Sequence, residues 1–70
     1  MYSTDLEALG SKLADVRKQA GLSQQKVAET IGTSQLTISN WETGKKSPRL
    51  KNYLDLLNLF DIDFNDMAKQ

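Results

Sequence analysis

Residues 23–44 contain a pattern of small, apolar and glycine positions that few arrangements of helices can satisfy. Counted from Gln24, the small residue Ala28 stands at position five and Gly32 at position nine. Apolar residues stand at positions four, eight, fifteen and eighteen: Val27, Ile31, Ile38 and Trp41. Helices that cross steeply need a small side chain where they touch, and the turn between them needs a residue that tolerates positive φ. The segment therefore predicts two short helices joined by a tight turn, a helix-turn-helix.

The ends of these two helices are also marked in the sequence. Ser23 is a good N-cap for the first helix, and Gly32 is expected to end it. The second helix is expected to follow Thr33 or Ser34 and to end at Gly44.

A further helix is predicted before this unit, over about residues 5–19. Apolar residues recur there at three- and four-residue steps: Leu6, Leu9, Leu13, Val16 and Ala20. A capping-box pattern begins at Thr4, and Gly21 is placed to end the helix in a left-handed conformation. Gly10 weakens the middle, so a start of the ordered helix only near Leu9 is the alternative.

After the unit, Ser47 is predicted to cap a fourth helix with Pro48 at its first position. The apolar stripe expected for that helix is Leu50, Tyr53, Leu54, Leu57 and Phe60. Asp63 can cap a short fifth helix from Phe64 to Lys69. No segment has the pattern of a strand. The sequence therefore predicts one compact all-α domain of five helices, spanning residues 1–70.

Composition excludes several classes of function. The chain has 70 residues with neither Cys nor His, which removes the usual zinc ligands and the usual general base at neutral pH. The Asp61 and Asp63 pair lacks the glycine and terminal Glu of a calcium loop. We therefore expect no metal, no cofactor and no enzymatic activity. No apolar run approaches the roughly 20 residues of a membrane span, and the start, MYSTDLEALG, does not have the pattern of a signal peptide. A cytoplasmic protein is expected.

Charge is divided along the chain although the net value is zero, with nine basic and nine acidic residues. Residues 23–52 contain five basic and two acidic side chains, a local charge of +3. Residues 53–70 contain one basic and four acidic side chains, a local charge of −3. A split of sign is more informative than the net value. The positive segment coincides with the two-helix unit and the loop after it.

The second helix of the unit carries a polar face opposite Ile38 and Trp41, which are expected to lie in the core. The residues of that face are Gln35, Leu36, Ser39, Asn40 and Thr43. The carboxamides of Gln35 and Asn40 can donate and accept at once, which matches N6 and N7 of adenine. In isolation, the same two residues would be taken for a solvated surface.

The other residues near this face also have chemical interpretations. Leu36 suits a thymine methyl group, but an exposed Leu equally suits a protein partner or a neighbouring helix. Ser34 and Ser39 are short enough to reach a phosphate or a base. Lys45 and Lys46 are flexible point charges, which suits sequence-independent contact with phosphates, although a merely solvated loop is the alternative.

The segment LSQQKVAETIGTSQLTISNWETGKKSP resembles the phage-repressor and Cro-type helix-turn-helix family, also called the XRE family. The resemblance is strongest over residues 13–48, about half of the chain. It implies a lambda-repressor-like DNA-binding domain of five helices, in which the second helix of the unit, the third of the chain, enters the major groove.

The resemblance also implies roles for individual residues. The residues expected to read bases are Ser34, Gln35, Leu36, Ser39 and Asn40. The residues expected to hold the DNA backbone are Gln24, Thr43, Lys45, Lys46 and Arg49. Members of the family often join an Arg of the first helix to the Glu near the end of the third. Arg17 and Glu42 stand at those positions, and we expect them to form a structural ion pair.

The function that this resemblance implies is sequence-specific binding of double-stranded DNA by a transcriptional regulator, most simply a repressor. A homodimer would bind a twofold-symmetric operator with half-sites about 34 Å apart. C-terminal apolar residues are expected to form part of the dimer contact, chosen from Leu57, Leu59, Phe60, Ile62, Phe64 and Met67. The alternative is an antitoxin or interaction module that binds a protein partner through its acidic C-terminal third, with DNA autoregulation secondary. A third interpretation is the DNA-binding part of a longer sensor.

Overall fold

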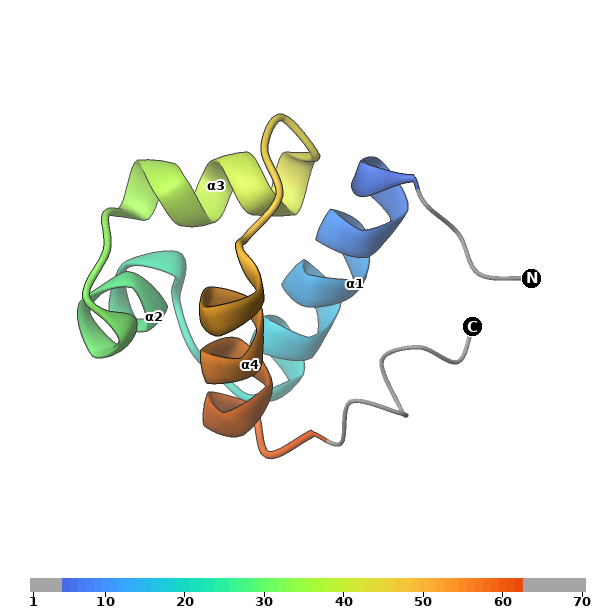
Figure 1. The fold of residues 1–70 in the computed structure, drawn as a ribbon. Coiled ribbons are helices and arrows are strands. Elements are labelled where there is room, and N and C mark those ends of the chain that lie inside the picture. The colour runs from blue at the N-terminus through green and yellow to red at the C-terminus, as the bar shows by residue number, and fades with distance from the viewer. Residues whose placement is uncertain (1–4, 63–70) are drawn as a thin grey trace.

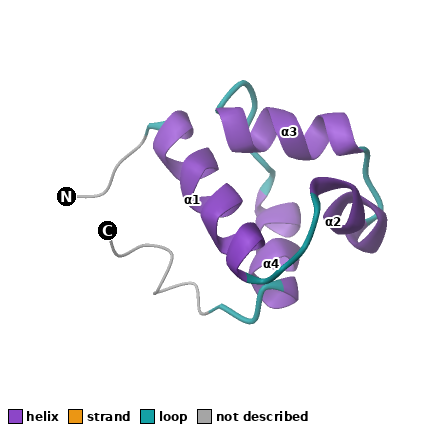
Figure 2. Ribbon diagram, turned by 180° about the vertical axis from the view of Figure 1, so that it is seen from behind, coloured by secondary structure: helices purple, strands orange, loops and turns teal. Residues whose placement is uncertain are grey.

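The computed structural model describes residues 5–62, and these form four helices packed around one core (Figure 1). The helices are α1 (Leu6–Gln19), α2 (Gln24–Ile31), α3 (Gln35–Thr43) and α4 (Leu50–Leu59). Seen from behind, this part of the chain contains helices and loops and no strand (Figure 2). The predicted all-helical class is confirmed, but the described helices number four rather than five. The expected fifth helix, Phe64 to Lys69 with Asp63 as its cap, lies outside the described residues.

The helix-turn-helix unit ends where its caps predict. The Ser23 side chain accepts a hydrogen bond from the Lys26 amide at 3.0 Å, and Ser34 accepts one from the Thr37 amide at 3.1 Å. Gly32 follows α2 with φ +82°, a conformation that costs an L-residue energy because of its Cβ. These contacts are local in sequence, which explains why the predicted boundaries of α2 and α3 hold.

The range of α1 agrees with the sequence prediction, but its capping residue differs. Its N-cap is Asp5, whose side chain accepts from the Glu7 amide at 2.9 Å, and Thr4 lies outside the described residues. The helix runs from Leu6 to Gln19, so the predicted range is confirmed and the alternative start near Leu9 is wrong. Gly10 is buried within it, and a Cβ there would collide with the Trp41 carbonyl oxygen and lie 2.6 Å from that of Glu42. Gly10 therefore permits the close approach of α1 and α3, which offsets its low helix propensity.

The start of α4 also differs from the sequence prediction. The helix begins at Leu50, and its N-cap is Arg49, which makes no side-chain capping bond. Ser47 and Pro48 precede the helix instead of opening it. Proline restricts its own φ to about −65° and disfavours helical backbone in the residue before it, so Pro48 is equally compatible with the extended connection that leads from α3 to α4.

The core is made of one face from each helix. Its buried apolar residues are Leu13, Val16, Val27, Ala28, Ile38, Trp41, Leu56 and Leu57. Trp41 therefore lies in the core, as its spacing from Ile38 predicts. The predicted stripe of α4 is wrong at Leu50 and Leu54, which are 68% and 47% exposed. The stripe is right at Tyr53, Leu57 and Phe60, and Leu56 joins them on the core side with helical spacing.

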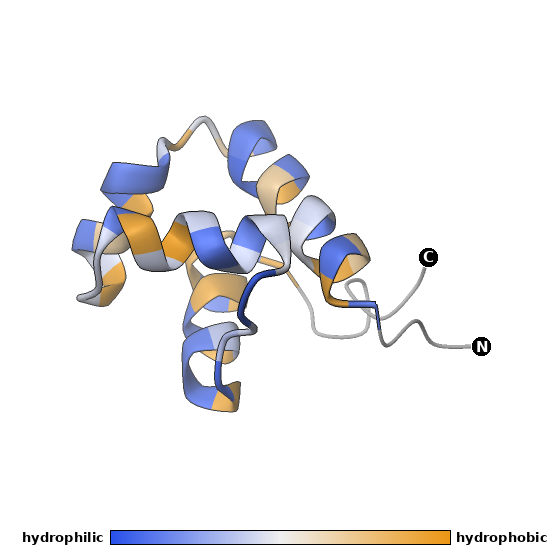
Figure 3. Ribbon diagram, turned by 90° about the horizontal axis from the view of Figure 1, so that it is seen from above, coloured by the Kyte–Doolittle hydropathy of each residue, from blue (hydrophilic) through white to orange (hydrophobic). Residues whose placement is uncertain are grey.

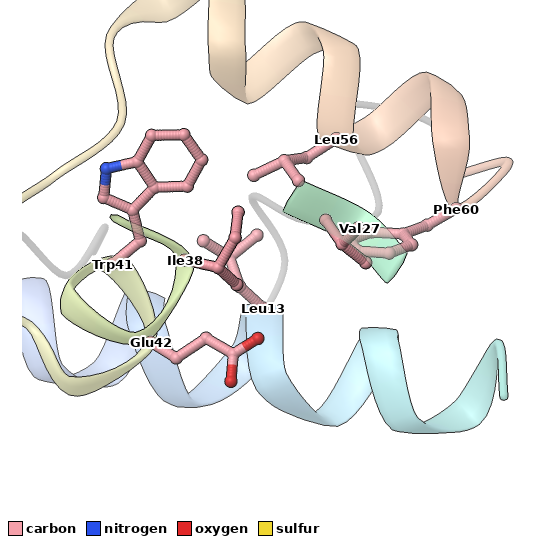
Figure 4. A pocket seen from close by; sticks show the side chains of 7 residues that line it. All are labelled: Leu13, Val27, Ile38, Trp41, Glu42, Leu56 and Phe60. Carbon is pink, nitrogen blue, oxygen red and sulfur yellow. The ribbon is translucent and has the colours of Figure 1, made fainter. Parts of the chain in front are cut away.

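A small cavity of about 10 Å³ lies where side chains from all four helices meet (Figure 4). Its lining residues are Leu13, Val27, Ile38, Trp41, Glu42, Leu56 and Phe60. A cavity of this size holds about one water molecule, so the core has no space for a small organic effector. No helix within residues 5–62 is both long and apolar enough to cross a bilayer.

Candidate nucleic-acid interface

Helix α3 lies along one side of the molecule, with Ile38 and Trp41 turned inward to the core. From above, α3 crosses the centre of the view, and the loop after it leads to α4 on one side (Figure 3). Gln35 and Leu36 are exposed, Leu36 to 69% of its surface, whereas Ser39 and Asn40 are half-buried. The structure therefore places four of the five expected base-reading residues along the outer side of α3.

The fifth expected base-reading residue, Ser34, precedes α3, and its side chain makes hydrogen bonds within the protein. Its hydroxyl oxygen accepts from the Thr37 amide and lies 2.8 Å from the Thr37 hydroxyl oxygen. Thr43, at the other end of α3, donates its hydroxyl hydrogen back to the Ser39 carbonyl at 2.9 Å. Ser34 and Thr43 are both exposed, but the hydroxyl group of each makes its hydrogen bonds within α3 or its cap. To contact a phosphate oxygen, which only accepts, such a hydroxyl group would rotate and donate its hydrogen outward.

An ion pair under α3 fixes the helix to α1. The Arg17 Nε donates to Glu42 Oε2 at 2.6 Å, and Nη2 donates to Oε1 at 3.1 Å. The third nitrogen, Nη1, donates to the Leu22 carbonyl at 2.8 Å. Arg17 and Glu42 therefore form the pair that their positions predict, with side chains only 10% and 8% exposed. A two-pronged contact of this kind sets orientation as well as distance.

Gln24 connects this ion pair to the outer face of α3. Its Nε2 donates to Glu42 Oε1 at 2.9 Å, and its Oε1 lies 3.5 Å from Gln35 Nε2, the limit of a hydrogen bond. Sequence reasoning expected Gln24 at a phosphate and did not find this bridging position. No local signal could have revealed it, because Gln24 and Glu42 are 18 residues apart. Gln24 therefore lies between the ion pair and Gln35, with a close hydrogen bond to Glu42 and a contact with Gln35 at the limiting distance.

Positive charge gathers at the end of α3. Lys45 and Lys46 follow the helix directly and are exposed, and Arg49 is exposed at the start of α4. The loop is held in place by two contacts: the Lys46 amide donates to the Asn40 carbonyl at 3.3 Å, and Gly44 packs so closely on α1 that a Cβ would lie 2.8 Å from the Glu7 nitrogen. The two ion pairs of the described residues, Arg17–Glu42 and Lys51–Asp55, do not involve these three cations.

The chemistry of this surface is polar recognition rather than catalysis. It contains carboxamides, hydroxyls and cations next to one exposed leucine, and no cluster of His, Cys, Asp or Glu within residues 5–62 could hold a metal ion. Such a surface can contact base edges and phosphates.

A sequence model of the helix-turn-helix family matches residues 13–67, which include α2, α3 and α4. The chain belongs to this family, of the XRE type. The resemblance inferred over residues 13–48 is therefore confirmed and extends further toward the C-terminus.

Curated relatives of this helix-turn-helix domain are named as transcriptional regulators rather than enzymes. It is 34% identical over 63 residues to the HTH-type transcriptional regulator PuuR of Escherichia coli, covering 90% of this chain and 34% of PuuR. It is 31% identical over 55 residues to the HTH-type transcriptional regulator ImmR of Bacillus subtilis, covering 79% of this chain and 43% of ImmR. The chain thus matches less than half the length of either relative.

Solved structures share the fold over nearly the whole chain. The restriction-modification controller protein C.AhdI from Aeromonas hydrophila is 30% identical with a TM-score of 0.83, over 90% of this chain and 91% of C.AhdI. The P22 c2 repressor, crystallised in complex with a synthetic operator, is 24% identical with a TM-score of 0.77, over 87% of this chain and 92% of the repressor. The lambda-repressor-like fold is therefore shown.

Proposed function

We propose that this chain is a sequence-specific transcriptional repressor that binds a twofold-symmetric DNA operator as a homodimer, with α3 in the major groove. The observation that carries the proposal is the arrangement around α3. The buried Arg17–Glu42 pair holds its inner side, Gln35 and Leu36 stand on its outer side, and cations follow its end. A rigid helix with polar readers on one side and phosphate anchors at its end meets the needs of groove recognition.

Base reading is assigned to the outer side of α3 and its cap: Ser34, Gln35, Leu36, Ser39 and Asn40. Gln35 and Asn40 are the candidates for adenine, whose N7 accepts and whose N6 donates in the major groove. Leu36 can only make apolar contact, and its 69% exposure makes the thymine methyl group its natural target. Ser39 contributes a short hydroxyl at half-buried depth.

Backbone contact is assigned to the residues that surround this reading face: Gln24, Thr43, Lys45, Lys46 and Arg49. Gln24 opens α2, where free amides and the helix dipole attract phosphate. Lys45, Lys46 and Arg49 supply sequence-independent attraction. The local charge of +3 over residues 23–52 compensates for the zero net charge of the chain. We expect binding to weaken steeply as salt rises, because phosphate contacts release counterions.

Repression is inferred from the likeness to the P22 c2 repressor, and dimerisation from the size of the reading face. One α3 helix reads only a few base pairs, so two copies related by a twofold axis are needed for a site of useful length. Repression requires only that bound protein occupies the DNA, which this surface is suited to do. The P22 c2 repressor, which shares this fold, supports the same mode of docking as a hypothesis.

The experiment that tests this proposal is selection from a random double-stranded DNA library at physiological salt. Enrichment of a twofold-symmetric site with A·T pairs at the positions facing Gln35 and Asn40 is the expected result. If no sequence is enriched and only weak, salt-sensitive binding is seen, the proposal is wrong. The antitoxin or protein-interaction function would then take its place.

A further inference from the structure

Leu36 and Asn40 stand one helical turn apart on the outer side of α3, and their side chains offer opposite chemistry. Residues four apart on a helix are neighbours on one face. Leu36 is apolar and 69% exposed, whereas Asn40 is half-buried. The Asn40 carboxamide takes part in no hydrogen bond within the described part of the chain. The pair therefore presents an apolar surface beside an unused donor and acceptor.

The backbone of Asn40 is held more firmly than its exposed neighbours suggest. Its carbonyl oxygen accepts from the Lys46 amide at 3.3 Å and lies 3.4 Å from the Thr43 hydroxyl oxygen, which donates to it. The next residue, Trp41, is 6% exposed in the core. An Asn side chain has one torsion angle fewer than the exposed Gln35, whose longer chain can turn aside. The Asn40 carboxamide is therefore presented from a fixed point and cannot retreat far.

The adenine edge that suits a carboxamide is sensitive to one chemical change. The amino group on N6 has two hydrogens: one pairs with thymine, and the other faces the major groove beside the N7 acceptor. A methyl group on N6 preserves the base pair only when it takes the groove-facing position. There it replaces the hydrogen that a carboxamide oxygen would accept, and it also crowds N7. An Asn carboxamide that fits adenine therefore does not fit N6-methyladenine.

We propose that this chain distinguishes methyl groups by their position in the major groove. N6-methyladenine opposite Asn40 weakens binding, whereas methyl groups on C5 of pyrimidines contact Leu36 and are favoured. The inference rests on the proposed DNA-binding function and names the form of DNA that the reading face takes. Thymine and 5-methylcytosine present the same C5 methyl group, and Leu36 has no polar atom that this group would deprive of water. Methylation of adenine in the operator would therefore release the protein.

The size of each effect follows from the contact that is changed. A carboxamide that contacts both N6 and N7 favours adenine over a wrong base by a factor of about 5–150. One N6-methyl group should cost a similar factor, because the acceptor oxygen of Asn40 then faces a methyl group. Replacing a thymine by uracil removes one methyl group from Leu36, which should weaken binding about fourfold.

Synthetic duplexes test the proposal. They carry the twofold site obtained by selection, with one N6-methyladenine at each adenine of one half-site in turn, and binding is followed by fluorescence anisotropy at constant salt. In the natural chain, methylation at one position should weaken binding about 5–150-fold. Asn40→Ala should bind the methylated and unmethylated duplexes about equally, because it has no carboxamide. Gln35→Ala is the matched control, since it removes the same group from the same helix and should keep the loss.

The outcomes separate this inference from the proposed function. Equal binding of the natural chain to every methylated duplex, or a selected site without adenine, would overturn it. A loss that persists in Asn40→Ala would also overturn it, because the methyl group would then act through the DNA or through another residue. Thymine-to-uracil duplexes should weaken the natural chain but not Leu36→Ala, and equal losses in both would show that Leu36 does not contact a methyl group. If no sequence is selected at all, the proposed function itself fails.

Discussion

Replacing Arg17 by Met removes the positive half of the buried ion pair and keeps much of the side-chain volume. Glu42 would lose two charge-assisted hydrogen bonds, at 2.6 and 3.1 Å, and keep only the one from Gln24. With its side chain 8% exposed, water cannot replace those bonds. Stranding a buried charge in this way costs about 3–5 kcal/mol.

This loss is large for so small a domain. At roughly 0.05–0.15 kcal/mol per residue, a chain of this length has a total stability on the order of 4–10 kcal/mol. Each kcal/mol corresponds to about 4–8 °C in a domain of this size. We expect Arg17→Met to lower Tm by on the order of 20 °C, measured by thermal unfolding followed with circular dichroism. Below its own Tm, the variant should still bind operator DNA.

Two further variants show whether loss of the Arg17–Glu42 pair causes the lower stability. Lys51→Met breaks the ion pair of α4, where the Lys51 side chain is 85% exposed, and should change stability by less than about 0.5 kcal/mol. Combining Arg17→Met with Glu42→Gln removes both buried charges and should restore roughly half of the lost stability. Unchanged stability in Arg17→Met, or a double variant that adds the two single losses, would refute the reasoning.

Other changes test separate parts of the molecule. Asp61 follows α4 with φ +57°, where glycine is favoured, so Asp61→Gly should raise stability in urea unfolding by about 0.5–1 kcal/mol, and a loss would contradict this account of the turn. Burial raises the pKa of the Tyr53 phenol above its usual 10.0, so the unfolded chain ionises first and stability falls as pH rises past that value. In Tyr53→Phe, unfolding measured at pH 8 and at about pH 10.5 should show a smaller fall. Asn40→Ala should weaken the best operator by about 1–3 kcal/mol and relax preference at one position, whereas Lys46→Ala should weaken all DNA about equally and flatten the salt dependence. If the two behave alike across sequences, the division into readers and anchors is wrong.

The ends of the helix-turn-helix unit are encoded locally. Ser23 and Ser34 each bond an amide three residues ahead, and Gly32 and Gly44 supply the left-handed backbone that ends each helix. Interactions across three or four residues depend little on the rest of the fold. For the same reason, helical spacing is enough to predict that Ile38 and Trp41 lie in the core.

Packing between helices selects which of two overlapping leucine patterns on α4 faces the core. Leu50 and Leu54 fit a helical stripe as well as Leu56 does, and periodicity alone cannot distinguish them. The choice depends on where α1, α2 and α3 meet α4. Packing against α3 likewise explains why Gly10 is buried in α1 rather than delaying its start.

Some features of the candidate site also follow from local sequence patterns, and others depend on packing between helices. Its residue types and their common face on α3 follow from helical spacing within a few residues. The bridge from Gln24 to Glu42, which links the ion pair to Gln35, joins residues far apart in the sequence. Short-range patterns in the sequence are therefore sufficient for the helix-turn-helix, its caps and the chemistry of its outer face. How that face is held and which leucines remain exposed depend on contacts between helices, and no local pattern encodes those contacts.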